Sequence, residues 1–377
     1  MKLLLFIVFI QISFAYGLRG KRCKEYEEYN LITTCEDNPD VFSDTSAIID
    51  RHGFPVENHT VYTKDGYILN VYRIPNPSGQ PVFLQHGAAA SSEWWVYTGN
   101  NSLAFRLARK GYDVWLGNTR GNYNSDERNH KTDKQYWNYT IDDMGNYDLP
   151  AVFDTIIKET NKRGEIIYVG HSQGTTEAMI YSITHRDEAK RNLKGLILIC
   201  PVAKMNSTNK LLINFVKILD VLQIDHTGSS NNLLTAILQN FGSLMKNLAN
   251  LSNYIYGPTN LYTAEYMPIF FRYLMSSEST LPLKQFAQMA SSGKFEAYNH
   301  GLGSPKVYDL SMINVPVHLI AGKNDALANL TDVMIVHEEI KNSKLTVMQG
   351  YNHMNFFFSK NIDDFYDEFD IAINNLK

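Results

Sequence analysis

Six short apolar runs punctuate the chain, and each is bounded by Gly, Pro, Asn, His or other polar residues. Runs this short, rich in β-branched and aromatic side chains, are typical of buried strands. They lie at residues 82–84, 113–116, 166–169, 196–199, 317–321 and 345–348.

Segments with helical periodicity separate the runs, at residues 101–109, 141–158 and 175–185. Strand and helix in alternation predict an α/β fold, in which a mostly parallel sheet carries helices on both faces.

The alternation stops between residues 204 and 305, where helix-like stretches at 210–222 and 233–251 occur without a core strand. We predict a mainly helical cap here rather than a separate domain, because active sites of parallel sheets lie at the carboxyl ends of strands. The predicted organisation is a signal peptide at 1–17, an α/β core at 18–203, the cap or lid at 204–305, and the rest of the core at 306–377.

The N-terminus has the composition of a signal peptide. Lys2 precedes an apolar run at 3–10, and the small residues Ser13, Ala15 and Gly17 follow. This layout predicts cleavage after Ala15 or Gly17, and the run is shorter than the roughly 20 residues of a spanning helix. No later segment is apolar enough to span, so we expect a secreted or lysosomal protein without a transmembrane anchor.

Six glycosylation sequons agree with a secretory route. They begin at Asn58, Asn100, Asn138, Asn206, Asn250 and Asn329.

Cys23 and Cys35 are close enough in sequence to pair in an oxidising compartment. Cys200 ends an apolar run, which favours a buried free thiol.

Charge and metal motifs exclude some functions. A net charge of −4 argues against nucleic acid binding, which favours basic surfaces. The chain has no CxxC and no HExxH pattern, so we expect no metal and no cofactor.

The sharpest chemical signal is Gly170-His171-Ser172-Gln173-Gly174, between the run at 166–169 and a predicted helix. A G-x-S-x-G pattern between strand and helix predicts a nucleophile elbow that exposes the hydroxyl of Ser172. The alternative is a glycine-bracketed turn without chemistry.

A serine nucleophile needs a base, and the base needs an acid that orients it. The chain order Ser, Asp, His is typical of the α/β-hydrolase fold, in which the nucleophile elbow occurs. Asp325 and His353 each follow a predicted strand on a loop, so we expect them to complete the triad. Asp332 and His337 are rivals, but they lie in a helix-like segment where a solvent-facing position is expected.

The oxyanion hole is predicted from the main-chain N–H groups of Ala88, after the run at 82–84, and Gln173. His86 and His171 are more plausible as hydrogen-bonding loop supports than as acid–base residues, since one base suffices.

With these pieces in order, the chain resembles the acid lipase family, which includes gastric and lysosomal acid lipases. The likeness covers nearly all of the mature sequence. The matching motifs are NPD at 38–40, TKDGYIL at 63–69, LQHG at 84–87, GNTRGN at 117–122, YDLP at 147–150, GHSQGTT at 170–176 and YNH at 351–353. The resemblance implies a lipase or esterase for acylglycerols or sterol esters that works at a lipid–water interface.

Several positions depart from the family pattern. Ala88 replaces a usual Leu, Asn355 replaces a usual Asp, and Glu177 stands where the helix is usually apolar. If Glu177 is buried, it needs a partner. The family's cysteines in the cap region are missing as well.

Two rivals remain at the level of sequence: a short-chain carboxylesterase or thioesterase with the same triad, and a lipid-binding protein without catalysis. Apolar cap residues are consistent with a lipid channel or with the cap's own core. They are Phe270, Phe271, Leu274, Met275, Phe286 and Met289. The oligomeric state is not readable from the sequence.

Overall fold

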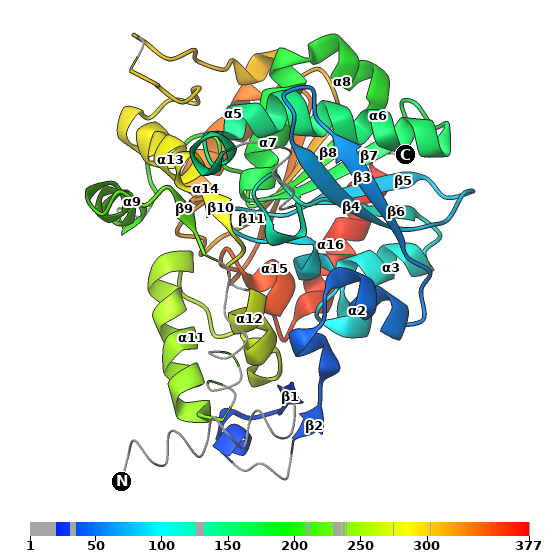
Figure 1. Cartoon of the computed structure of the whole chain (residues 1–377), viewed down its shortest axis with the longest axis vertical. Coiled ribbons are helices and arrows are strands. Elements are labelled where there is room, and N and C mark those ends of the chain that lie inside the picture. Colours follow the sequence, from blue (N-terminus) through cyan, green and yellow to red (C-terminus); the bar gives the residue numbers. More distant parts are fainter. Residues whose placement is uncertain are drawn as a thin grey trace.

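Eight strands form one central sheet in the order β12-β11-β8-β7-β5-β6-β4-β3 (Figure 1). The computed structural model describes residues 20–30, 35–125, 132–208, 211–228, 235, 238, 240–273, 275–301 and 303–376, so the predicted signal peptide lies outside the described residues. The strands are β3 (Glu57–Tyr62), β4 (Ile68–Ile74), β5 (Pro81–Gln85), β6 (Asp113–Leu116), β7 (Ile166–His171), β8 (Leu193–Ile199), β11 (Val317–Gly322) and β12 (Ser343–Met348).

The six strands predicted from apolar runs are confirmed, and they pair in parallel. Every residue of β5, β6 and β7 is buried, as continuous apolar runs predict for strands covered on both faces. Sequence reasoning missed the antiparallel strands β3 and β4. β3 is at the sheet edge, and its alternating exposed polar residues gave no apolar run.

Helices cover both faces of the sheet, so the predicted α/β architecture is confirmed. In Figure 1, α6, α7 and α8 lie above the sheet, and α2, α3 and α16 lie below it. The helices that follow the core strands or precede them are α2 (Thr45–Arg51), α3 (Leu103–Arg109), α4 (Asp133–Tyr136), α5 (Ile141–Asp143), α6 (Leu149–Thr160), α7 (Gln173–Thr184), α8 (Arg186–Asn192), α14 (Leu330–Glu339), α15 (Asn355–Phe358) and α16 (Ile362–Asn374). The predicted helix at 141–158 is interrupted by a π-helical turn, Met144–Asp148.

The chain changes direction across the sheet at β5. From β5 it moves outward to β6, and it then returns to place β7 on the other side of β5. Ligands of open α/β sheets bind at such a switch point, outside the carboxyl ends of the strands. The segments containing Gly87 and Ser172 leave the sheet at this point.

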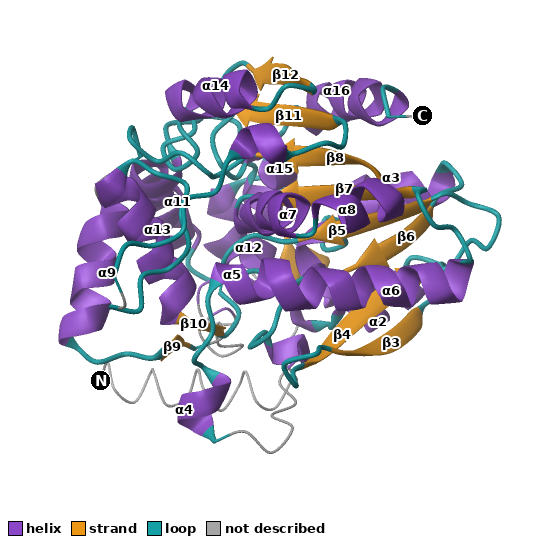
Figure 2. Ribbon diagram, turned by 90° about the horizontal axis from the view of Figure 1, so that it is seen from above, coloured by secondary structure: helices purple, strands orange, loops and turns teal. Residues whose placement is uncertain are grey.

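Residues 204–305 lie between β8 and β11, and we call them the inserted segment. Their described elements add no strand to the central sheet and gather at one end of the strands in Figure 2. These elements are α9 (Leu211–Val221), β9 (His226–Thr227), α11 (Gly242–Tyr256), α12 (Met267–Tyr273), β10 (Glu278–Ser279) and α13 (Thr280–Ser292). The helix predicted at 233–251 instead begins at Gly242 in the described residues and continues to Tyr256, while part of 233–239 lies outside them.

Within the part of the chain that the structure describes, no helix is both long and apolar enough to cross a bilayer. A disulfide joins Cys23 to Cys35 and links the short paired strands β1 (Lys21–Arg22) and β2 (Glu36–Asp37). Cys200 is a buried free thiol, as predicted.

The six sequon asparagines are accessible to different degrees. Asn58, Asn100, Asn138, Asn206 and Asn250 are exposed. Asn329 is partly buried, and its side chain accepts a hydrogen bond from the Thr331 amide at the start of α14.

Candidate active site

Ser172 stands at the sharp turn between β7 and α7. Its backbone has φ +52° and ψ −116°, a conformation that non-glycine residues rarely adopt. The Ser172 amide donates to the Ile199 carbonyl at 3.0 Å, and its carbonyl accepts from the Thr175 hydroxyl at 2.6 Å. Such strained backbone persists only where neighbouring contacts hold it, and it is concentrated at functional sites.

The glycines on either side of Ser172 permit the close approach of helix and strand. A Cβ added to Gly170 would lie 2.8 Å from the Gly174 carbonyl carbon. A Cβ added to Gly174 would lie 2.8 Å from the carbonyl oxygens of both Gln85 and His86. The predicted requirement for small residues therefore has a direct steric cause at both positions.

The structure brings Ser172, His353 and Asp325 into one hydrogen-bonded chain. His353 Nδ1 donates to Asp325 Oδ2 at 2.7 Å, and His353 Nε2 is 2.8 Å from Ser172 Oγ. His353 and Asp325 are buried, whereas Ser172 is partly exposed. With Nδ1 protonated, Nε2 carries the free lone pair that can accept the serine proton.

Asp325 is held as a carboxylate in a buried position. Burial alone would raise its pKa, but the neighbouring His353 and its hydrogen bond bring the pKa below its ordinary value. The second oxygen, Oδ1, accepts the main-chain amides of Leu327 and Ala328 at 2.8 and 2.9 Å. These two donors fix the plane of the carboxylate, so Oδ2 points at the ring.

The inserted segment braces both triad loops. The Tyr256 carbonyl at the end of α11 accepts the main-chain amides of Ala326 and His353, each at 3.2 Å. The Tyr256 ring lies nearly parallel to the His353 ring at 6.2 Å between centroids. Sequence reasoning missed this contact, because nothing in the local pattern around Tyr256 signals it.

The loop after β5 lies directly against the nucleophile. A Cβ added to Gly87 would be 3.0 Å from the Ser172 Cβ, so the main chain entering Ala88 runs beside the serine. Gln173 follows Ser172 and begins α7, which leaves its main-chain N–H among the first amides of a helix. Both predicted oxyanion donors thus come from segments that border the Ser172 side chain.

His86 and His171 support loops in this structure. His86 Nδ1 donates to the Gly87 carbonyl at 2.8 Å, and Nε2 accepts the Thr119 amide at 3.3 Å. His171 Nε2 donates to the His353 carbonyl at 3.0 Å. Burial lowers the pKa of His86 to about 4 and that of His171 to about 3, so both rings are neutral at physiological pH.

Two buried carboxyl groups flank the Gln173 side chain. Its Nε2 donates to Glu278 Oε1 at 2.7 Å and lies 3.3 Å from Glu177 Oε1. Burial raises the pKa of Glu278 to about 7 and the pKa of Glu177 well above its ordinary value. Glu177 is buried, and Gln173 gives its Oε1 a hydrogen bond, whereas its Oε2 has no partner among the described residues. Glu278 was not anticipated from sequence.

The rival residues lie outside the triad. Asp332 and His337 are on α14, as predicted, but Asp332 does not face solvent. It is buried, and its carboxylate accepts the Ser207 amide at 2.7 Å, which ties α14 to the start of the inserted segment. His337 Nδ1 is 2.7 Å from the Ser343 hydroxyl.

His171, Cys200 and His353 place potential metal-ligand atoms within 4.8 Å of one another. Both ring nitrogens of His353 are already hydrogen-bonded, to Asp325 and Ser172. Burial raises the pKa of the Cys200 thiol well above its ordinary value, whereas a metal ligand must be a thiolate. The donor set therefore suits triad packing better than metal binding.

The Asn355 departure also has a structural role. Asn355 Oδ1 accepts the Asn352 amide at 2.8 Å, and Asn352 Oδ1 accepts the Met354 amide at 3.0 Å. These bonds shape the turn that carries His353.

Of the apolar residues considered for a channel, Phe270, Phe286 and Met289 are buried in the core. Leu274 lies outside the described residues.

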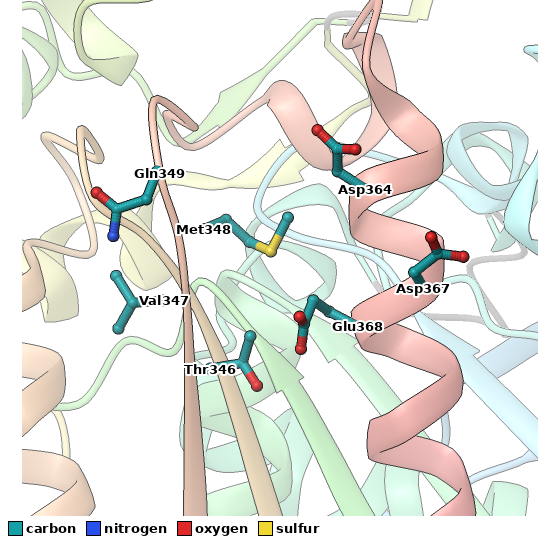
Figure 3. A pocket seen from close by; sticks show the side chains of 7 residues that line it. All are labelled: Thr346, Val347, Met348, Gln349, Asp364, Asp367 and Glu368. Atoms are coloured by element: carbon teal, nitrogen blue, oxygen red, sulfur yellow. The ribbon is translucent and has the colours of Figure 1, made fainter.

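A pocket of about 370 Å³ lies between β12 and α16 (Figure 3). Its carboxylates come from α16, and its other side chains come from β12 and the residue after it. The lining residues are Thr346, Val347, Met348, Gln349, Asp364, Asp367 and Glu368. The triad residues do not line this pocket.

Comparisons with known proteins agree with the fold. A family model described as alpha/beta hydrolase fold matches residues 80–360, and one described as a partial alpha/beta-hydrolase lipase region matches residues 45–99. A solved carboxylesterase from the thaumarchaeon Nitrososphaera gargenis is 15% identical at a TM-score of 0.57, covering 84% of this chain and 98% of that one. The chain is an α/β hydrolase.

Curated relatives place it more narrowly. Lipase member K of Mus musculus is 34% identical over 359 residues, which cover 86% of this chain and 88% of that protein. Gastric triacylglycerol lipase of Rattus norvegicus is 33% identical over 356 residues, covering 85% and 89%. The chain belongs to the acid lipase family, and it is a carboxylic-ester hydrolase.

Proposed function

We propose that this protein is a serine lipase of the secretory pathway that hydrolyses neutral lipid esters, either acylglycerols or sterol esters, through an acyl-enzyme. The observation that carries the proposal is the unbroken hydrogen-bonded chain from Ser172 through His353 to Asp325. No further residue is needed to activate the hydroxyl.

In the acylation step, Ser172 Oγ attacks the ester carbonyl carbon while His353 Nε2 takes the hydroxyl proton. Asp325 stabilises the imidazolium through its 2.7 Å bond to Nδ1. The carbonyl oxygen becomes negative and accepts hydrogen bonds from the N–H groups of Ala88 and Gln173, each of which typically lowers the barrier by about 3–4 kcal/mol. The C–O bond to the alcohol then breaks, and His353 returns the proton to the leaving oxygen.

In the deacylation step, water replaces the alcohol. His353 removes a proton from water, the hydroxide attacks the acyl carbon, and the same two amides hold the second oxyanion. The bond to Ser172 breaks, the serine recovers its proton from His353, and the fatty acid leaves. No cofactor takes part in this scheme.

The inserted segment serves as the cap in this proposal, and its outer helices contact the lipid–water interface. Exposed large apolar residues are concentrated on and beside α9 and α11, a position that costs free energy in water. They are Ile218, Val221 and Leu222 with α9, and Phe241, Leu244, Leu251, Tyr254 and Ile255 with α11. A lipid surface would remove these groups from water.

The proposed location is extracellular or lysosomal. A disulfide at Cys23–Cys35 and five exposed sequon asparagines suit a chain that passes through an oxidising, glycosylating compartment. Glycosylation at these positions remains a prediction, which removal of N-glycans followed by mass measurement would test.

A substrate panel tests the function. Emulsified long-chain triacylglycerol, cholesteryl ester, a soluble short-chain ester and an acyl thioester are assayed across pH, with wild type and Ser172→Ala. We expect Ser172→Ala to lose hydrolysis of every substrate, and wild type to favour an emulsified neutral lipid. A preference for the soluble ester or the thioester would overturn the lipase assignment while leaving the nucleophile intact.

A further inference from the structure

The inserted segment forms hydrogen bonds with both the amide and the carbonyl of Ala89, the residue that follows the proposed oxyanion donor Ala88. The Ala89 amide donates to Glu278 Oε2 at 2.7 Å, and the Ala89 carbonyl accepts the Ser276 amide at 2.6 Å. Ala89 has φ +50°, which is unfavourable for a residue with a Cβ. The contacts with residues 276–278 therefore help to hold a strained loop in place.

The same carboxylate reaches the other half of the oxyanion hole. Glu278 Oε1 accepts the Gln173 side-chain amide at 2.7 Å, and Gln173 is the residue whose main-chain N–H follows Ser172. Glu278 is itself fixed, because its amide donates to the Thr227 hydroxyl at 3.1 Å and its side chain is buried. One side chain thus bridges the β5 loop and the nucleophile turn.

We propose that Glu278 is a positioning residue, through which the inserted segment sets the separation of the Ala88 and Gln173 amides. The inference rests on the proposed function, in which these amides hold the oxyanion. Both carboxylate oxygens are occupied by protein donors, so Glu278 acts through its neighbours. Oxyanion stabilisation depends on donors held in place before the charge develops, and a displacement of about 1 Å can cost about 100-fold in rate.

A role in geometry also fits the sign of the charge. An ionised carboxylate repels a nearby developing oxyanion, because the two charges have the same sign. The charge of Glu278 therefore cannot stabilise the transition state directly. Glu177 and Tyr139 face the same region, and burial raises the pKa of each well above its ordinary value. Glu278 is the member of this group that bonds to both oxyanion segments.

The test uses the full chain and a soluble short-chain p-nitrophenyl ester, which needs no interface. At pH 8, above the pKa of about 7 that burial gives Glu278, Glu278→Gln keeps the side-chain volume but turns one acceptor into a donor that faces another donor, and Glu278→Ala removes both acceptors. We expect each to lower kcat about 10- to 100-fold with KM changed less than about threefold. Affinity for a trifluoromethyl ketone, which forms a tetrahedral oxyanion on the serine, should fall by the same factor as kcat/KM.

Glu296→Gln is the matched control, because Glu296 is a buried glutamate of the inserted segment that accepts from Gln288. It should keep wild-type kcat. The proposal is overturned if both Glu278 variants keep kcat within about threefold, or if only KM rises, as loosening of the segment alone predicts. If Glu278→Ala fails to fold, the kcat of Glu278→Gln alone decides the test. Retained hydrolysis in Ser172→Ala would instead remove the proposed function, which separates the two failures.

Discussion

The carboxylate of Asp325 meets the ring of His353 through one oxygen, Oδ2, at 2.7 Å, while its other oxygen is held by main-chain amides. In Asp325→Asn, those amides would keep the side-chain oxygen at the Oδ1 position and direct the NH₂ group at His353. The ring would then have to accept at Nδ1 and carry its proton on Nε2, where it cannot serve as base.

We therefore expect Asp325→Asn to lower kcat by roughly 10⁴-fold on a soluble ester, with its melting temperature nearly unchanged. Asp332→Asn is the control, because Asp332 is a buried acid that accepts the Ser207 amide. Activity loss in Asp332→Asn with retention in Asp325→Asn would reverse the assignment of the acid.

Gly174→Ala tests the steric account of the elbow. The new Cβ would meet two backbone oxygens, of Gln85 and His86, at 2.8 Å, and neither can rotate away as a side chain could. We expect a loss of about 1–3 kcal/mol in the free energy of unfolding, together with lower kcat. Gly228→Ala, where nothing lies within 4 Å of the added Cβ, should unfold at the wild-type denaturant concentration.

Arg120 pairs with one buried carboxylate, Asp148, and with one partly exposed carboxylate, Asp65. It is buried, donates to Asp148 through Nε at 2.9 Å and to Asp65 through Nη1 at 2.6 Å. Arg120→Met would leave Asp148 buried without its partner, at a cost of about 3–5 kcal/mol in the free energy of unfolding. Lys246→Met removes an exposed ion pair to Glu27 and should change the free energy of unfolding far less. Equal effects of the two changes in chemical denaturation would refute this role.

The raised pKa of Glu278 predicts a specific pH dependence of stability. Burial raises its pKa from 4.5 to about 7, despite the hydrogen bonds from Gln173 and Ala89. Between these values the folded chain keeps a proton that the unfolded chain has lost. The resulting contribution is complete below pH about 4.5 and is lost as pH rises through about 7.

Chemical denaturation of wild type and Glu278→Gln at pH 5, 6, 7 and 8 measures this effect. The stability of wild type relative to the variant should fall across the series, by roughly 2.5 kcal/mol in all. Parallel curves would mean that Glu278 has an ordinary pKa in the folded protein.

The sequence was most informative where local chemistry decides the structure. Buried strands require continuous apolar runs, and the elbow at Ser172 requires small neighbours, so both left clear patterns. Asp325 and His353 followed from their positions after strands. Strand β3 was not predicted, because an edge strand that is exposed on one side mixes polar and apolar residues and has no continuous apolar run.

Contacts between distant segments left no local pattern. Glu278 meets Ala89 across 189 positions, and the role of Tyr256 beside His353 depends on how α11 packs. The burial of Asp332 was missed for the same reason, since its partner Ser207 is 125 positions away. The pairing of these residues follows from the tertiary fold.

Labelling with a fluorophosphonate, followed by peptide mapping, tests the central claim most directly. The reagent forms a stable adduct only with a serine whose hydroxyl is activated, and it requires no knowledge of the natural substrate. We predict one modified peptide, with the adduct on Ser172, loss of esterase activity in proportion to labelling, and no labelling of Ser172→Ala. An adduct on a different serine, or esterase activity that survives complete modification of Ser172, would contradict the account.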